Sequence, residues 1–96
     1  MSDDKVMNRL DELIKNGEAV LATKRSSDMG SDSVSNDIFH QWRVESLSFL
    51  QAAFGDSGIF FTEFKEKCKD SYHHHAEEGL AILNGAKSEL DSGDIF

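Results

Sequence analysis

Proline is absent from this chain of 96 residues, and cysteine occurs once, as Cys68. Without proline, no residue forces a break in the periodic apolar segments, which favours helices. A single cysteine excludes an internal disulfide framework and a zinc site built from several cysteines. No apolar run approaches the roughly 18 residues of a membrane span, and no signal-peptide core follows Met1. These absences predict a soluble, cytoplasmic protein that contacts no membrane.

Basic residues are outnumbered by acidic ones, 10 to 18, which gives a net charge of −8 at pH 7. Because phosphate backbones repel such a chain, we expect no direct binding to nucleic acid. The acidic excess lies in residues 26–58 and 71–96, whereas residues 1–25 and 59–70 contain equal numbers of acids and bases. This dispersal weakens the idea of a nucleic-acid mimic, which needs closely spaced carboxylates along one continuous face.

Length and a hydrophobic content of 39% predict one compact domain spanning residues 1–96. Apolar residues recur every three to four positions, and no two-residue period appears over a useful length. We therefore expect an all-α, small four-helix bundle-like domain with helices at about 3–24, 37–54, 59–69 and 72–91. Short connections predict antiparallel neighbours for the second to fourth helices.

Two glycines and one polar segment add detail to this predicted arrangement of helices. Gly17 interrupts the apolar stripe of the first helix, where it either costs about 1 kcal/mol or marks close packing against a neighbouring helix. Gly55 follows the second helix as its expected C-terminal residue. Residues 25–36 are rich in Ser, Asp and Gly and poor in large apolar groups, so they predict a flexible loop that is either functional or simply loose.

Three consecutive histidines, His73–His75, suggest a metal site together with Cys68. Zinc needs three or four ligands converging on one point, yet consecutive helical residues point about 100° apart. The more ordinary interpretation is a partly exposed helix N-terminus. Cys68 lies on the apolar stripe of the third helix, where a cysteine usually acts as an inert small hydrophobe. The sequence therefore predicts no metal site and no cofactor.

Catalytic patterns are also missing. The acidic pairs, such as Glu77–Glu78, are adjacent in helices and point apart, so they cannot form an acid–base dyad. No glycine-rich elbow presents a serine, and no phosphate-cradling loop occurs. We expect that the protein is not an enzyme. An enzyme or metalloprotein built on Cys68 and His73–His75 is the remaining third interpretation.

Aromatic residues exceed what one narrow stripe can bury. Trp42, Phe49 and Phe54 suit a core, whereas Phe60 and Phe61 are adjacent on a short helix, so one of them must turn outward. Arg43 is the only base within residues 26–58 and is the expected charged anchor for a partner. The candidate partner-binding residues are Arg43, Phe60, Phe61, Glu77 and Glu78.

The pattern of packing residues resembles the helical N-terminal module of uncharacterised bacterial and prophage proteins linked to antiviral defence. In those proteins the module is often fused to a nucleotide-binding or TIR-like effector. The residues that carry this resemblance are Leu10-x-x-Leu13-Ile14-x-x-Gly17, Phe39-x-x-Trp42-Arg43-x-x-Ser46-Leu47-x-Phe49-Leu50, Phe54-Gly55-x-Ser57, Phe64 and Gly79-Leu80-x-Ile82-Leu83. The resemblance implies a recognition or scaffold role, although no effector follows Phe96 in this sequence.

Two functions from different classes follow. The first is a non-enzymatic protein-interaction module, in the conflict between bacteria and phages, that binds another protein; homodimerisation is left open. The alternative is a small acidic, phage-type inhibitor, similar to an anti-CRISPR protein, that blocks the nucleic-acid groove of a host defence complex. Binding by the second type should weaken steeply as salt rises, because salt screens exposed charges.

Overall fold

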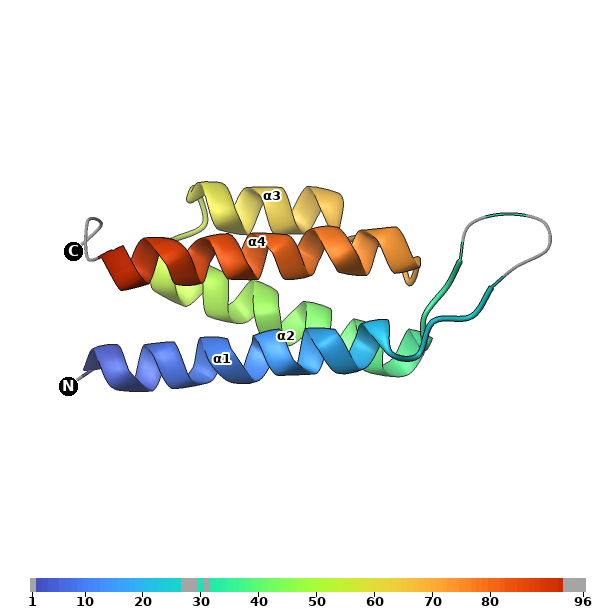
Figure 1. The fold of residues 1–96 in the computed structure, drawn as a ribbon. Coiled ribbons are helices and arrows are strands. Elements are labelled where there is room, and N and C mark those ends of the chain that lie inside the picture. The colour runs from blue at the N-terminus through green and yellow to red at the C-terminus, as the bar shows by residue number, and fades with distance from the viewer. Residues whose placement is uncertain (1, 27–29, 31, 93–96) are drawn as a thin grey trace.

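The computed structural model describes residues 2–26, 30 and 32–92. These residues form four helices: α1 (Ser2–Leu21), α2 (Asn36–Phe54), α3 (Ile59–Lys67) and α4 (His73–Ser92). Each helix runs antiparallel to the preceding one, and the bundle closes because α1 also packs against α4 (Figure 1). The all-α, four-helix bundle-like fold predicted from the sequence is confirmed, including the antiparallel order of α2 to α4.

Trp42 of α2 occupies the centre of the core and is only 2% exposed. Its ring makes edge contacts with Phe39 and Phe64, at centroid distances of 6.1 and 5.5 Å. The other core side chains come from α1, α2 and α4, from the segment before α2 and from the residue just beyond α3: Leu10, Leu13, Val20, Val34, Leu50, Cys68, Ala76, Leu83 and Ala86. Burial of these stripes is the main source of stability in a bundle of this size.

Two glycines let neighbouring helices approach the tryptophan. A Cβ atom at Gly17 of α1 would lie 2.8 Å from the Trp42 ring, and one at Gly79 of α4 would lie 3.0 Å from it. The indole Nε1 then donates a hydrogen bond to the backbone oxygen of Leu13, at 2.8 Å. Of the two alternatives for Gly17, close packing is therefore the one observed.

Helix α1 ends at Leu21 rather than near Lys24. The Thr23 hydroxyl donates to the backbone oxygen of Val20 at 2.6 Å and accepts from the backbone N–H of Ser35 at 2.8 Å. A threonine side chain that bonds the backbone in this way competes with further helical turns. The same residue therefore ends the helix and ties the following segment to it.

Helix α3 is also shorter than predicted and ends at Lys67 rather than Lys69. Cys68 leaves the helical conformation, and its backbone oxygen accepts a hydrogen bond from Arg43 Nε at 2.6 Å. At the other end, Gly55 adopts a φ of 87°, which a residue with a side chain rarely adopts. The tight turn between α2 and α3 depends on this conformation.

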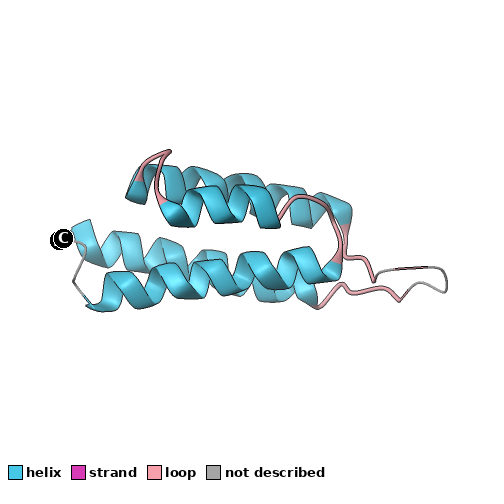
Figure 2. Cartoon of the chain, turned by 90° about the horizontal axis from the view of Figure 1, so that it is seen from above, coloured by secondary structure: helices cyan, strands magenta, loops and turns pink. Residues whose placement is uncertain are grey.

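The ends of the predicted flexible loop are attached to the bundle. Arg25 and Ser33 form an isolated antiparallel bridge, and Ser33 forms another with Tyr72. The Val34 side chain is buried, and its N–H donates to the backbone oxygen of Ser71 at 2.9 Å. Residues 27–29 and 31 of this segment lie outside the described residues. Figure 2 shows that the described parts of this segment lie at the end of the bundle.

Candidate partner-binding site

A depression of about 460 Å³ lies along the outer side of α3, where this helix packs against α2. Its lining comes from α2, from the turn between α2 and α3, from α3 and from a residue just beyond α3: Arg43, Asp56, Phe61, Thr62, Lys65, Glu66 and Lys69. Most of these side chains are exposed, whereas Arg43 and Phe61 are half-buried. The depression is therefore an open trough rather than an enclosed ligand cavity.

Arg43 is fixed in place at one wall of this trough. Its Nε atom donates to the backbone oxygen of Cys68 at 2.6 Å, which joins α2 to the end of α3. No other hydrogen bond of this guanidinium is formed within the described residues. An arginine group has five N–H donors, so the remaining donors stay available to a carboxylate of a partner.

Phe61 and Lys65 also line the trough and contact each other. The Lys65 ammonium lies 5.9 Å from the centre of the Phe61 ring, within the range of a cation–π contact. Lys69, just beyond the end of α3, also lines the trough. Lys65 and Lys69 are not among the site residues predicted from the sequence, although the four-residue spacing of Phe61 and Lys65 places these two on one helix face.

Phe60 lies on a different side of α3 and does not line the trough. Its ring packs against Phe54 at a centroid distance of 5.0 Å, and a Cβ atom at Gly85 of α4 would contact it at 3.4 Å. Both members of the adjacent pair are half-buried and pack against the core, so neither turns fully outward as predicted; of the two, only Phe61 lines the trough. The structure brings Arg43 and Phe61 together and separates Phe60 from them.

Glu77 and Glu78, the other candidate residues, lie on α4 away from the trough. Glu77 is exposed and lies 3.5 Å from His73 Nδ1. Glu78 is exposed, and its charge contributes to raising the pKa of Cys68. Neither glutamate lines the trough.

The three histidines make different polar contacts, although the rings of His74 and His75 meet at a centroid distance of 4.5 Å and both contact Tyr72. His73 Nδ1 lies near the Glu77 carboxylate, and the backbone N–H of His73 donates to the backbone oxygen of Asp32. His75 Nδ1 accepts a hydrogen bond from the Asp70 N–H at 3.1 Å, and His74 stacks on Tyr72 at 5.9 Å. Within residues 2–26, 30 and 32–92, no three His, Cys, Asp or Glu side chains are grouped to hold a metal ion.

Cys68 is fully buried at the end of α3. Burial raises the pKa of its thiol from 9.0 to about 12; the Arg43 charge opposes this rise, and Glu78 adds to it. A thiol with such a pKa is almost entirely protonated at neutral pH, and only the thiolate is a strong nucleophile. Its environment is that of a packing residue.

No family model matches this chain, and comparisons with curated proteins and with solved structures found no match. The resemblance to helical modules of bacterial and prophage proteins therefore stays a prediction. None of the helices in the described part of the chain is long and apolar enough to cross a membrane.

Proposed function

We propose that this protein is a non-enzymatic interaction module that binds another protein through the trough between α2 and α3. The observation that carries the proposal is that Arg43 and Phe61, far apart in sequence, share this trough with Lys65 and Lys69. Arginine and aromatic residues are the side chains most often found at the centre of protein interfaces. The trough is open rather than enclosed, which suits a segment of a protein chain better than a small molecule that needs a closed cavity.

The charges along the trough are unequal. Arg43, Lys65 and Lys69 contribute three positive charges, and Asp56 and Glu66 contribute two negative ones. A chain with a net charge of −8 thus exposes a slightly positive surface here. We infer that the bound segment places a carboxylate near Arg43 and an apolar side chain on Phe61.

The biological setting we propose is the conflict between bacteria and phages. Its support is the resemblance of the helical packing residues described above, and no contact in the trough bears on it.

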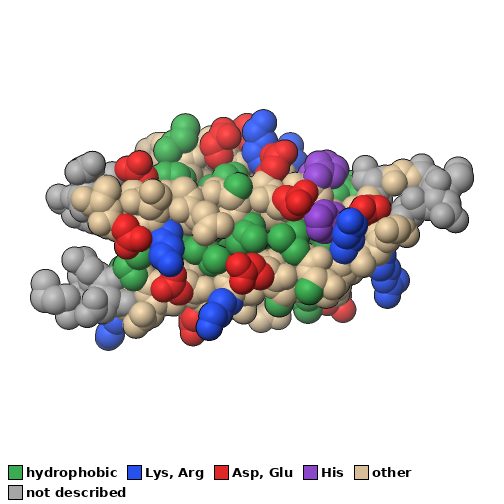
Figure 3. All heavy atoms as spheres, viewed as in Figure 1, with side chains coloured by type: hydrophobic (Ala, Val, Ile, Leu, Met, Phe, Trp, Pro, Cys, Tyr) green, Lys and Arg blue, Asp and Glu red, His purple; other side chains and the backbone are tan. Residues whose placement is uncertain are grey.

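The alternative, an acidic inhibitor that blocks a nucleic-acid groove, would use the carboxylates of α1 and α4. On the face shown in Figure 3, acidic and basic side chains are interspersed. Asp11 pairs with Lys87 at 2.9 Å, and Glu12 pairs with Arg9 at 3.1 Å. These pairs reduce the negative potential that a phosphate mimic needs, so they favour the interaction module over the inhibitor.

A photo-reactive benzoyl-phenylalanine in place of Thr62, an exposed residue that lines the trough, tests the proposal in the host cell. We expect one discrete covalent adduct from this position and none from Ser88, an exposed position on α4. The adduct should disappear in the double variant Lys65→Glu/Lys69→Glu and persist in Lys15→Glu/Lys67→Glu, which changes the net charge equally. An adduct that survives the first variant, or the same adduct from position 88, would contradict the proposed site.

A further inference from the structure

The outward face of α2, beside α1, carries few charges for a surface helix. Val44 is 60% exposed and Ile38 is 39% exposed, although both are large apolar residues. The other outward positions are mostly small or uncharged: Gln41, Ser48, Gln51 and Ala52. A charge-poor, partly apolar patch on a strongly charged protein is typical of an interface with another macromolecule.

Three shallow depressions follow the seam between α1 and α2 beneath this face. The first lies between Ala19 and Ile38, the second between Arg9 and Val44, and the third between Val6 and Ala53. Glu45 lines both the first and the second, and Phe49 lines both the second and the third. The depressions therefore form one continuous groove, which we call the α1–α2 groove.

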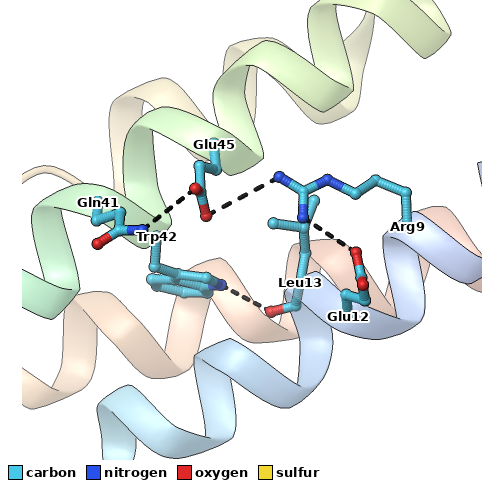
Figure 4. A network of polar contacts seen from close by, with 6 residues as sticks. All are labelled: Arg9, Glu12, Leu13, Gln41, Trp42 and Glu45. Carbon is cyan, nitrogen blue, oxygen red and sulfur yellow. Dashed lines mark hydrogen bonds and ion pairs between the residues drawn. The ribbon is translucent and has the colours of Figure 1, made fainter.

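The network at the middle of this groove is shown in Figure 4. Trp42 and its hydrogen bond to Leu13 lie beneath it, and Arg9 reaches across it toward Glu45. The Arg9–Glu45 distance is 3.9 Å, and both side chains are partly exposed. Such a long, solvated ion pair contributes little to stability, so these two groups can exchange partners at low cost.

The positions of the exposed side chains are complementary to the groove under a two-fold rotation. Ile38 precedes Val44 by six residues, or about 9 Å along the helix. The depression lined by Phe49, Ala52 and Ala53 lies five to nine residues beyond Val44, or about 8–13 Å in the opposite direction. A two-fold axis across α2 near Val44 would therefore bring Ile38 of each copy over this depression of the other copy.

The charges follow the same symmetry. Lys5 and Arg9 line the depression that would receive Ile38, and Asp37 immediately precedes Ile38. In the antiparallel arrangement, Asp37 of each copy lies near Lys5 of the other. Arg9 and Glu45 both lie near the axis, where Arg9 of one copy can pair with Glu45 of the other. Opposite charges thus meet at the axis and at each Asp37–Lys5 contact.

We propose that the α1–α2 groove binds a second copy of this chain, with the two α2 helices antiparallel across Val44. The dimer leaves the α2–α3 trough on the other flank of α2, so each dimer presents two troughs. This proposal goes beyond the proposed function and does not depend on it.

Sedimentation velocity from about 10 μM to about 1 mM tests the dimer, since a patch of this kind is expected to associate in this range. The wild-type chain of 10.7 kDa should approach twice that mass as concentration rises. Val44→Glu places two like charges near the axis and should raise the dissociation constant at least about tenfold. Ile59→Glu is the matched control, because Ile59 is 68% exposed on α3, outside the groove. Circular dichroism of both variants verifies that they remain folded.

A charge swap separates the proposed arrangement from nonspecific association. Lys5→Glu and Asp37→Lys should each weaken the dimer several-fold, because each creates a like-charge pair. The double variant Lys5→Glu/Asp37→Lys restores opposite charges, has the wild-type net charge and should recover most of the affinity. A wild-type chain that stays monomeric throughout overturns the proposal, and so does a dimer that Val44→Glu leaves intact. A double variant no tighter than either single variant overturns the antiparallel arrangement.

Discussion

Trp42 packs directly on Gly17, so closely that a Cβ atom on this glycine would lie 2.8 Å from the indole ring. The contact brings α1 and α2 together in the middle of the bundle. It also places the indole N–H within 2.8 Å of the Leu13 backbone oxygen. The glycine, the ring and the hydrogen bond therefore depend on one another.

In Gly17→Ala the added methyl group overpacks the core, which should cost about 1–3 kcal/mol. The gain of about 1 kcal/mol that alanine brings to a helix offsets part of this cost, so we expect a net destabilisation of up to about 2 kcal/mol. Urea unfolding followed by Trp42 fluorescence measures it. Gly85→Ala is the control: its Cβ atom would meet Phe60 at 3.4 Å, an ordinary contact, so this variant should be at least as stable as the wild type. Equal effects of both variants would show that helix propensity alone governs Gly17.

Ser46 is fully buried on α2, and its hydroxyl has no hydrogen-bond partner among the described residues. A buried polar group without a partner is costly, so Ser46→Ala should raise the free energy of unfolding by about 1 kcal/mol. Ser48→Ala, at an exposed position of the same helix, should change it by less than about 0.5 kcal/mol. Thermal and urea unfolding give both values. A clear loss of stability in Ser46→Ala would mean that the hydroxyl forms a bond in solution.

The buried thiol of Cys68 should make the free energy of unfolding depend on pH in the alkaline range. The folded thiol keeps its proton up to a pKa of about 12, whereas the unfolded thiol ionises near 9.0. The unfolded state therefore releases protons first, and stability falls as pH rises from 9.0 toward 12. The difference in free energy of unfolding between the wild-type protein and Cys68→Ala should stay constant below pH 9. Above pH 9 the wild-type protein should lose stability relative to the variant. A difference that does not change above pH 9 would contradict the burial of the thiol.

Periodicity predicted the helices because each apolar stripe is a local property of the chain. It also placed Trp42 in the core and Gly55 at a helix end. The predicted C-terminal ends of α1 and α3 were wrong by three and two residues. The reason is that Thr23 and Arg43 form hydrogen bonds with backbone groups that are distant in sequence. Such contacts depend on tertiary packing and leave no local pattern.

The proposed binding surface was predictable only in part. Arg43 and Phe61 stood out by their chemistry, and they do share the trough. Lys65 and Lys69 were overlooked because lysines on an exposed helix face are common. Val44 and Ile38 were overlooked as surface residues because α2 is apolar nearly all round, so its sequence does not reveal which flank faces solvent.

The affinity of the protein for the partner captured by crosslinking at position 62 tests the central claim most directly. By isothermal titration, Lys65→Glu/Lys69→Glu should bind that partner at least about tenfold more weakly than the wild type, a loss of about 1.4 kcal/mol. Lys15→Glu/Lys67→Glu, with the same net charge, should remain within about threefold of the wild type. Equal weakening by both variants, or by neither, would contradict binding in the α2–α3 trough.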